Sequence, residues 1–354
     1  MTAVEEPKLP AKLAAHPSVQ AVLARRRADG DAKPPTVIDA AWLRELCLAA
    51  GADDAAAVGL DHPDLAGERE YVRAALPGTR TLVAMAFRMN RDNCRSPARS
   101  VANQEFHQTD EHANHAARGV VQALQDAGHH AINPSVGFPQ EMDRFGTDRI
   151  WVVAHKTVAV AAGLGVMGLH RNVIHPKFGS FVLLATVLVD AEVSEYGQAL
   201  DYNPCIDCKL CVTACPVGAI AKDGRFDGLA CTTHNYREFM TGFTDWVQTV
   251  ADSEDAADYR SRVSASESAS MWQSLSSPPG YKSGYCLAVC PAGEDVLGPY
   301  LEDRKGFLKT VLRPLQDKRE TLYVLPGSRA QEYARRRFPH KPVKEVTGGW
   351  APPE

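Results

Sequence analysis

Apolar residues in the first 200 positions follow two patterns, one helical and one typical of buried strands. The helical patterns cover residues 40–49 and 110–126, and the continuous apolar runs cover residues 79–89 and 179–190. Asp39 precedes the first helical pattern as a candidate N-cap, and Gly128 follows the second as a stop signal. Residues 156–165 fit either a strand or a helix. This alternation predicts an α/β or α+β domain over residues 36–200.

Changes in composition divide the chain into four predicted parts. They are an N-terminal tail with one short helix (1–35), the mixed domain (36–200), a cysteine-rich domain (201–295) and a C-terminal segment that packs back on the core (296–354). Residues 250–280 are rich in Ser, Ala and acidic residues, and they predict a lid or a surface insertion with its own helix. Near the C-terminus, residues 319–327 predict the last strand and residues 334–345 a basic tail.

Composition is that of an ordinary globular protein, with 45% hydrophobic and 23% charged residues. The net charge of −4 argues against a dedicated nucleic-acid binder. No apolar run approaches the length of about 18 residues that a membrane span needs, and the N-terminus lacks the pattern of a secretory signal. We therefore expect a cytoplasmic protein with no membrane partner, in which nine cysteines are metal ligands or free thiols rather than disulfides.

Seven of the nine cysteines lie in two runs and the segment between them. Residues 205–216 fit the ferredoxin spacing C-x2-C-x2-C-x3-C-P, which lets three thiolates reach one iron–sulfur cluster from a single loop. Zinc, the main competing metal, usually takes two separated C-x2-C pairs. In two-cluster ferredoxins the fourth cysteine of a run binds the other cluster. That rule assigns one [4Fe–4S] cluster to Cys205, Cys208, Cys211 and Cys290.

The second cluster is one cysteine short. The same rule gives it Cys215 and Cys286, and Cys231 is the nearest further thiol. Ser283 replaces the opening cysteine of the second run and falls in the fourth ligand slot of this cluster. Four alternatives account for the gap. The Ser283 oxygen binds weakly, His234 or another residue fills the position, the cluster is [3Fe–4S], or Cys47 or Cys94 reaches in from the first domain.

A glycine motif, G-x-G-x-x-G, stands at Gly163, Gly165 and Gly168, and Asp190 follows a later strand. The glycines and the acidic residue match most of the sequence motif that binds dinucleotides. Only seven residues separate Gly168 from Pro176, whereas a crossover helix needs about a dozen. The spacing therefore favours a loop that lets the backbone approach another large cofactor.

Three stretches in this order resemble the superfamily of epoxyqueuosine reductases and reductive dehalogenases. They are residues 162–193, 205–220 and 285–291, and the likeness extends over about residues 36–295. The resemblance implies an α+β protein with a nitroreductase-like α/β core and a ferredoxin-like module carrying two [4Fe–4S] clusters. It also implies a cobalamin between them, which receives electrons from the clusters and reduces the substrate. The implied partners are a small-molecule or tRNA-borne substrate and an external low-potential donor of the ferredoxin or flavodoxin type.

The resemblance also suggests site residues. Epoxyqueuosine reductases place an aspartate general acid shortly before the glycine motif. Here Asp148 lies about one residue out of register, and His155 and Lys156 stand nearby as candidates for proton transfer or for binding an anionic group. The candidate cofactor-binding residues are Gly163, Leu164, Gly165, Gly168, His170, Arg171 and His175. The basic residues 335–341 are either a solvated tail or a contact for RNA phosphates.

These observations predict a reductase that passes single electrons through two iron–sulfur clusters to a corrin, similar to epoxyqueuosine reductase. One alternative is a soluble reductive dehalogenase. Another, from a different class, is a ferredoxin-like electron-transfer protein without a corrin. A nicotinamide-dependent reductase is the least favoured alternative.

Overall fold

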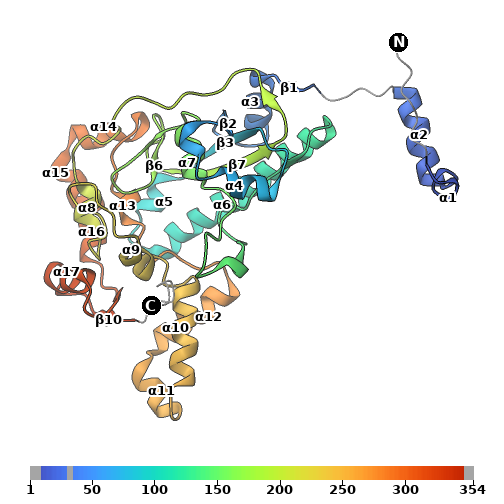
Figure 1. The fold of residues 1–354 in the computed structure, drawn as a ribbon. Helices are drawn as coiled ribbons and strands as arrows, with labels where there is room; N and C mark the ends of the chain where they lie inside the picture. Colours follow the sequence, from blue (N-terminus) through green and yellow to red (C-terminus); the bar gives the residue numbers. More distant parts are fainter. Residues whose placement is uncertain (1–8, 30–34, 347–354) are drawn as a thin grey trace.

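The computed structural model describes residues 9–29 and 35–346. Predictions that fall on residues 1–8, 30–34 and 347–354 lie outside the described part. The N-terminal part contains two helices, α1 (Ala11–Ala14) and α2 (Pro17–Asp29), where one short helix was expected. Both stand apart from the body of the protein (Figure 1).

A four-stranded antiparallel sheet forms the centre of the first domain. Its strands are β2 (Asp54–Gly59), β3 (Thr81–Arg88), β7 (Val182–Val189) and β4 (Ala131–Ile132), in the order β2-β3-β7-β4. The two long strands pair over their whole length, from Thr81 opposite Val189 to Arg88 opposite Val182. Both predicted strands are thus confirmed, and the fold is of the α+β class.

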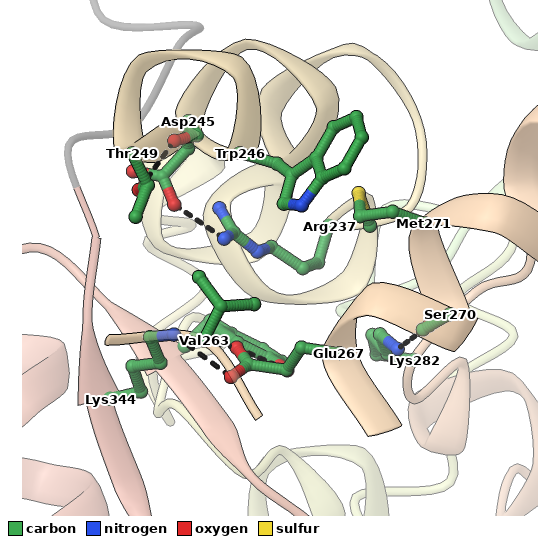
Figure 2. Close-up of a pocket in the computed structure, with 11 residues that line it drawn as sticks. Arg237, Asp245, Trp246, Thr249, Val263, Glu267, Ser270, Met271, Lys282 and Lys344 are labelled. Carbon is green, nitrogen blue, oxygen red and sulfur yellow. Dashed lines mark hydrogen bonds and ion pairs between the residues drawn. The ribbon is translucent and has the colours of Figure 1, made fainter. Parts of the chain in front are cut away.

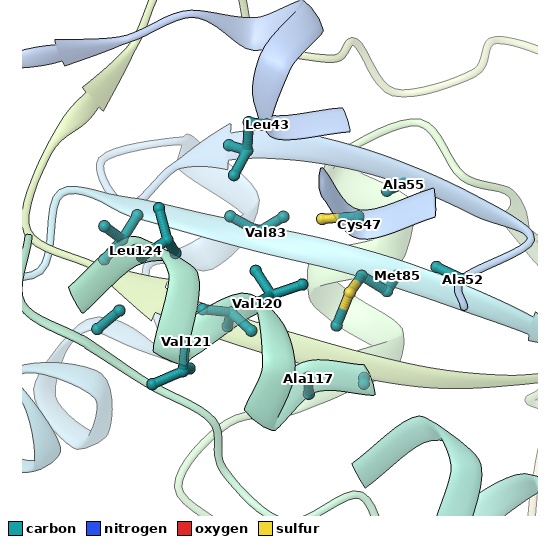
Figure 3. Packing of buried hydrophobic residues seen from close by; sticks show 14 of the residues in the cluster. Leu43, Cys47, Ala52, Ala55, Val83, Met85, Ala117, Val120, Val121 and Leu124 are labelled. Atoms are coloured by element: carbon teal, nitrogen blue, oxygen red, sulfur yellow. The ribbon is translucent and has the colours of Figure 1, made fainter. Parts of the chain in front are cut away.

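Helices cover both faces of this sheet. On one face lie α3 (Ala40–Ala49) and α6 (Arg99–Asp126), and on the other lie α4 (Arg69–Ala75) and α7 (His155–Ala161). Alternate residues of a strand point to opposite faces, so Val83 and Met85 pack against α3 and α6 (Figure 3) while Leu82 packs on the other side. Because both faces are buried, the strands appear in the sequence as continuous apolar runs.

Local signals in the core are mostly confirmed. The Asp39 carboxylate accepts a hydrogen bond from the Trp42 backbone N–H at 2.8 Å and caps α3, as expected. Residues 156–165, which fitted either element, begin with the helix α7. Two further pairs flank the sheet. They are the parallel pair β1 (Val37–Ile38) with β8 (Glu192–Val193) and the hairpin β5 (Val166–Met167) with β6 (Val173–Ile174).

The cysteine-rich part is helical and carries an insertion. Its helices are α8 (Leu210–Ala214), α9 (Gly228–Asn235), α10 (Met240–Ala251), α11 (Ala256–Arg262), α12 (Ala265–Ser276) and α13 (Tyr285–Ala288). The insertion formed by α10, α11 and α12 extends away from the sheet (Figure 1). The first of these helices begins at Met240, ten residues before the segment 250–280 whose composition predicted a lid or an insertion.

A polar network fastens the insertion to the rest of the module (Figure 2). Arg237 donates to Asp245 of α10 at 2.5 Å, and the Lys344 ammonium lies 2.8 Å from the Glu267 carboxylate of α12. The cavity enclosed by these residues measures only about 20 Å³, little more than one water molecule requires. It is therefore part of the structural framework rather than a binding site.

The C-terminal segment packs chiefly against the cysteine-rich part, although it was expected on the core. Its elements are α14 (Glu294–Glu302), α15 (Arg304–Phe307), α16 (Arg313–Asp317), β9 (Leu322–Val324), α17 (Arg329–Arg337) and β10 (Val343–Glu345). Two predictions need correction here. The strand at residues 322–324 is not the last, because β10 pairs with it in parallel, and residues 334–345 are not a tail, because Ala334 and Phe338 are buried. No helix in the described ranges is long and apolar enough to span a membrane.

Candidate iron–sulfur site

The two cysteine runs build the same local structure. Each run turns through a residue with a left-handed backbone, Lys209 (φ 52°) or Gly284 (φ 63°), and then enters a short helix, α8 or α13. The two helices pack together through Leu210 and Tyr285. This correspondence places Ser283 at the position that Cys208 holds in the first run.

The first thiol group surrounds a cavity of about 430 Å³. Its members, which we call the outer group because the loop around them includes the exposed Ile206 and Asp207, are Cys205, Cys208, Cys211 and Cys290. In a cubane each iron takes one thiolate, so four thiols around a cavity fit a [4Fe–4S] cluster. Within residues 9–29 and 35–346, no three His, Cys, Asp or Glu side chains converge closely enough to hold a single metal ion.

A second thiol group of the module does not line this cavity. Its members, here the inner group, are Cys215, Cys231 and Cys286. Burial raises the pKa of the Cys231 thiol to about 12, and burial together with the neighbouring cysteines raises the pKa of Cys286 still further. Without metal these groups are neutral thiols. Iron would take the place of their protons, because a coordinated thiol is deprotonated.

Ser283 lies beside the inner group through Asn235, which follows Cys231 by one turn of α9. The Asn235 Oδ1 atom accepts hydrogen bonds from the Ser283 N–H at 2.9 Å, the Ser283 hydroxyl at 3.0 Å and the Gly284 N–H at 2.9 Å. The hydroxyl proton is thus turned toward Asn235, and the oxygen lone pairs are free to point elsewhere. The cysteine spacing predicted neither a role for Asn235 nor its contact with Ser283.

The other residues considered for the gap are placed differently. The His234 Nδ1 atom accepts from the Tyr323 N–H at 3.3 Å, and its ring stacks on Tyr323 of β9. Cys47 packs inside the sheet core (Figure 3), and Cys94 packs with Phe106 and Phe181. We therefore keep Ser283 as the candidate fourth ligand and regard the others as less favoured.

Lys156 connects the core to the inner group. Its ammonium donates to the Arg171 carbonyl and to the Asn172 Oδ1 atom, both at 2.9 Å, and the Asn172 amide approaches the Cys286 sulfur at 4.0 Å. Part of Lys156 is solvent-accessible, yet its ammonium lies deep enough for burial to lower its pKa, while the neighbouring Cys286 and Cys231 act in the opposite direction. A positive charge here complements an anionic cluster.

The candidate proton donors His155 and Asp148 both form hydrogen bonds with other groups of the protein. The His155 Nε2–H donates to the Ser135 carbonyl at 3.0 Å, so Nδ1 accepts from the Thr186 hydroxyl at 2.9 Å, and burial lowers the pKa of His155. Asp148 is exposed, and hydrogen bonds from the Tyr71 hydroxyl and the Arg149 backbone lower its pKa. In these positions neither holds a proton that is ready to leave near neutral pH.

The glycine motif lies on the β5–β6 hairpin, without a crossover helix. A Cβ atom at Gly163 would lie 2.2 Å from the Gln198 carbonyl oxygen, and one at Gly165 would lie 2.6 Å from the Ile174 carbonyl oxygen. At both glycines the group that approaches closely is therefore a backbone carbonyl of the same chain. Of the neighbouring candidates, Leu164 is buried in the core and His175 donates to Asp54 at 3.1 Å.

The rest of that turn faces the outer group. Gly168, His170 and Arg171 line the same cavity as the four thiols, and the Leu169 N–H donates to the Cys205 sulfur at 3.4 Å. His170 is buried, and burial followed by the charge of Lys156 lowers its pKa to about 4. The turn therefore holds a neutral imidazole next to the candidate cluster.

A second cavity, of about 620 Å³, opens in the first domain between α6 and the segment 133–141. The cavity is within the range of about 300–1,000 Å³ typical of small-molecule sites. The buried hydroxyl of Ser135 on its wall has no partner. Phe138 on the same wall stacks on Phe239 at 5.8 Å, which contacts Tyr236 at 5.2 Å, next to the inner group. The cavity is thus connected to the inner thiols through aromatic rings.

These features define the class of protein, an α+β core joined to a ferredoxin-type iron–sulfur module. Comparison with known families agrees, because the 4Fe-4S binding domain matches residues 199–221.

Comparison with individual proteins is more specific. The chain is 32% identical over 102 residues to an epoxyqueuosine reductase of Cellulophaga algicola, which covers 27% of this chain and 33% of that protein. An epoxyqueuosine reductase of Bacillus anthracis is 29% identical over 184 residues, or 50% of this chain and 41% of the relative. The solved epoxyqueuosine reductase of Streptococcus thermophilus aligns at 16% identity with a TM-score of 0.43, over 77% of this chain and 74% of that one.

The similarity inferred from the motifs to the superfamily of epoxyqueuosine reductases and reductive dehalogenases is thus confirmed. The matched stretches span a third or less of the first four curated relatives.

Proposed function

We propose that the protein is a reductase that carries electrons from the outer to the inner thiol group, each holding an iron–sulfur cluster. The observation that carries this proposal is the division of seven cysteines into two groups. Four line one cavity, and of the other three, Cys231 and Cys286 lie near Lys156. The outer group is reached from an exposed loop, so an external low-potential donor would deliver electrons there. The inner group adjoins the core, so it would pass them inward.

Cobalamin is the proposed acceptor on the core side. When bound, it would supply a strongly reducing metal centre for the reduction of an organic substrate. Lys156 is positioned to bind an anionic group at this junction, and the unpartnered Ser135 hydroxyl offers a hydrogen bond at the wall of the 620 Å³ cavity. His155 orients that wall by holding the Ser135 carbonyl. The proposed substrate enters this cavity, and the relatives favour an epoxyqueuosine-type substrate over a halogenated one.

Absorbance spectra of protein purified without oxygen test this proposal. We expect a broad band near ~400 nm from the clusters, and corrin bands that shift on reduction after cobalamin is added. Iron and sulfide analysis should give two clusters for each chain. A cluster band with no retained corrin would instead support an electron-transfer protein, and a colourless or zinc-containing protein would reject both functions.

Ser283→Cys tests the fourth ligand of the inner cluster. A thiolate in place of a weak oxygen ligand should change the reduction potential of the inner cluster and leave the outer one as it was. Redox titration followed by EPR measures both. The matched control is Ser274→Cys, a half-buried serine of α12 whose hydroxyl donates to the Met271 carbonyl at 2.8 Å, away from both thiol groups. Unchanged potentials in the Ser283 variant would place this residue away from the metal.

A further inference from the structure

The turn of residues 168–172 lies between the two thiol groups. The Leu169 N–H donates to Cys205 of the outer group, and the Asn172 side chain approaches Cys286 of the inner group. His170 is in the middle of this turn and is only 4% exposed. Any polar hydrogen that it carries is therefore withdrawn from solvent and close to the clusters proposed above.

The proton of the neutral His170 ring can be placed on one nitrogen. Its Nδ1 atom accepts a hydrogen bond from the Asn172 backbone N–H at 3.1 Å, so the proton is on Nε2. The Nε2 atom is buried and has no hydrogen-bond partner among the residues that the structure describes. Leaving a buried donor unsatisfied is costly, and so such a group usually has a partner.

Gly168 fixes the position of this ring. A Cβ atom at residue 168 would lie 2.9 Å from the His170 Cε1 atom, so only glycine lets the imidazole fold back over the turn. Gly168 and His170 both line the outer cavity together with Cys205, Cys208, Cys211 and Cys290. The outer group is therefore the side on which we place the missing partner of Nε2–H.

We infer that His170 donates an N–H···S hydrogen bond to the outer iron–sulfur cluster and thereby raises its reduction potential. This inference rests on the proposed function, since it requires the outer cluster. A hydrogen bond to a cluster sulfur stabilises the more negative, reduced state, and hydrogen bonds of this kind are among the factors that set cluster potentials. His170 would make the outer cluster the better acceptor for electrons that arrive at the exposed loop.

Two variants of similar size test this role in the full chain. His170→Gln keeps an N–H donor, whereas His170→Met has none. In redox titrations followed by EPR, we expect the methionine variant to lower the ratio of reduced to oxidised outer cluster about tenfold at a fixed potential, or about 59 mV for one electron. The glutamine variant should remain near the native value, and the inner cluster should not shift in either.

Pulsed EPR gives a second measurement. Native reduced protein should show, besides the exchangeable proton of the Leu169 N–H, a second one coupled to the outer cluster, which disappears in D2O and is missing in His170→Met. Equal outer-cluster potentials in the two variants would overturn the inference, as would a shift confined to the inner cluster. Native protein that contains no clusters would reject the proposed function itself, so the two failures are distinguishable.

Discussion

Replacing Cys286 by alanine should remove the inner cluster and leave the outer one in place. Cys286 is one of only three thiols in the inner group, so its loss leaves Cys215 and Cys231, too few to hold a cubane. The outer group keeps all four thiols around its cavity. Iron and acid-labile sulfide should therefore fall to about half of the native content. Alanine is preferred to serine, whose oxygen could still bind iron.

In Cys286→Ala the rate of substrate reduction should fall by a larger factor than the iron content. If electrons pass from the outer to the inner group, the variant can still accept an electron but cannot deliver it to the core. Substrate reduction should fall to the background rate while chemical reduction of the outer cluster continues. Anaerobic metal analysis, EPR of the reduced protein and a turnover assay measure the three quantities separately.

Cys47→Ala is the matched control. Cys47 is a fully buried thiol that packs in the sheet core (Figure 3) and belongs to neither thiol group. Its replacement should leave iron and sulfide unchanged and cost only core packing. Native iron content in Cys286→Ala would contradict the division into two groups. Loss of all iron would show that the two sites do not assemble independently.

Sequence patterns predict the parts of this protein whose signals are local. The strands β3 and β7 are apolar throughout because helices cover both sheet faces, and Asp39 caps α3 through a contact only three residues away. The start of α6 was missed because its first turns are polar. One of these polar residues, Glu105, is buried and accepts hydrogen bonds from Asn90 and Asn93, so it interrupts the apolar pattern.

Long-range relations could not be predicted in the same way. The order β2-β3-β7-β4 depends on pairings between distant segments that no turn signal specifies. The contact between Ser283 and Asn235 joins two segments 48 residues apart. The glycine motif misleads for a related reason. A glycine indicates that some group approaches the backbone closely. It does not tell whether that group is a cofactor or, as at Gly163, a carbonyl of the same chain.

Gly179→Ala should loosen the junction between the core and the cysteine-rich part. Gly179 has a left-handed backbone (φ 67°), which costs a residue with a side chain about 1–2 kcal/mol. A Cβ atom there would also lie 2.0 Å from the Ala292 carbonyl oxygen, and relieving such overpacking typically costs about 1–3 kcal/mol. The combined loss of about 2–5 kcal/mol should lower the apparent midpoint of thermal unfolding by about 4–10 °C.

The same change should also disturb the outer cluster, because Ala292 follows Cys290 by two residues. The Glu294 N–H donates to the Pro176 carbonyl at 2.9 Å beside this contact, so the two backbones move together when Gly179 is displaced. We expect partial loss of outer-cluster iron on mild heating, before the chain unfolds.

Gly67→Ala is the control for this variant. Gly67 is exposed and no atom lies within 4 Å of its added Cβ, so the change should stay within about 0.5 kcal/mol. The unfolding midpoint and the iron retained after heating are compared between the two variants. Equal values would mean that the FGS turn at residues 178–180 does not pack against the segment after Cys290, and the link from the core to the outer group would have to lie elsewhere.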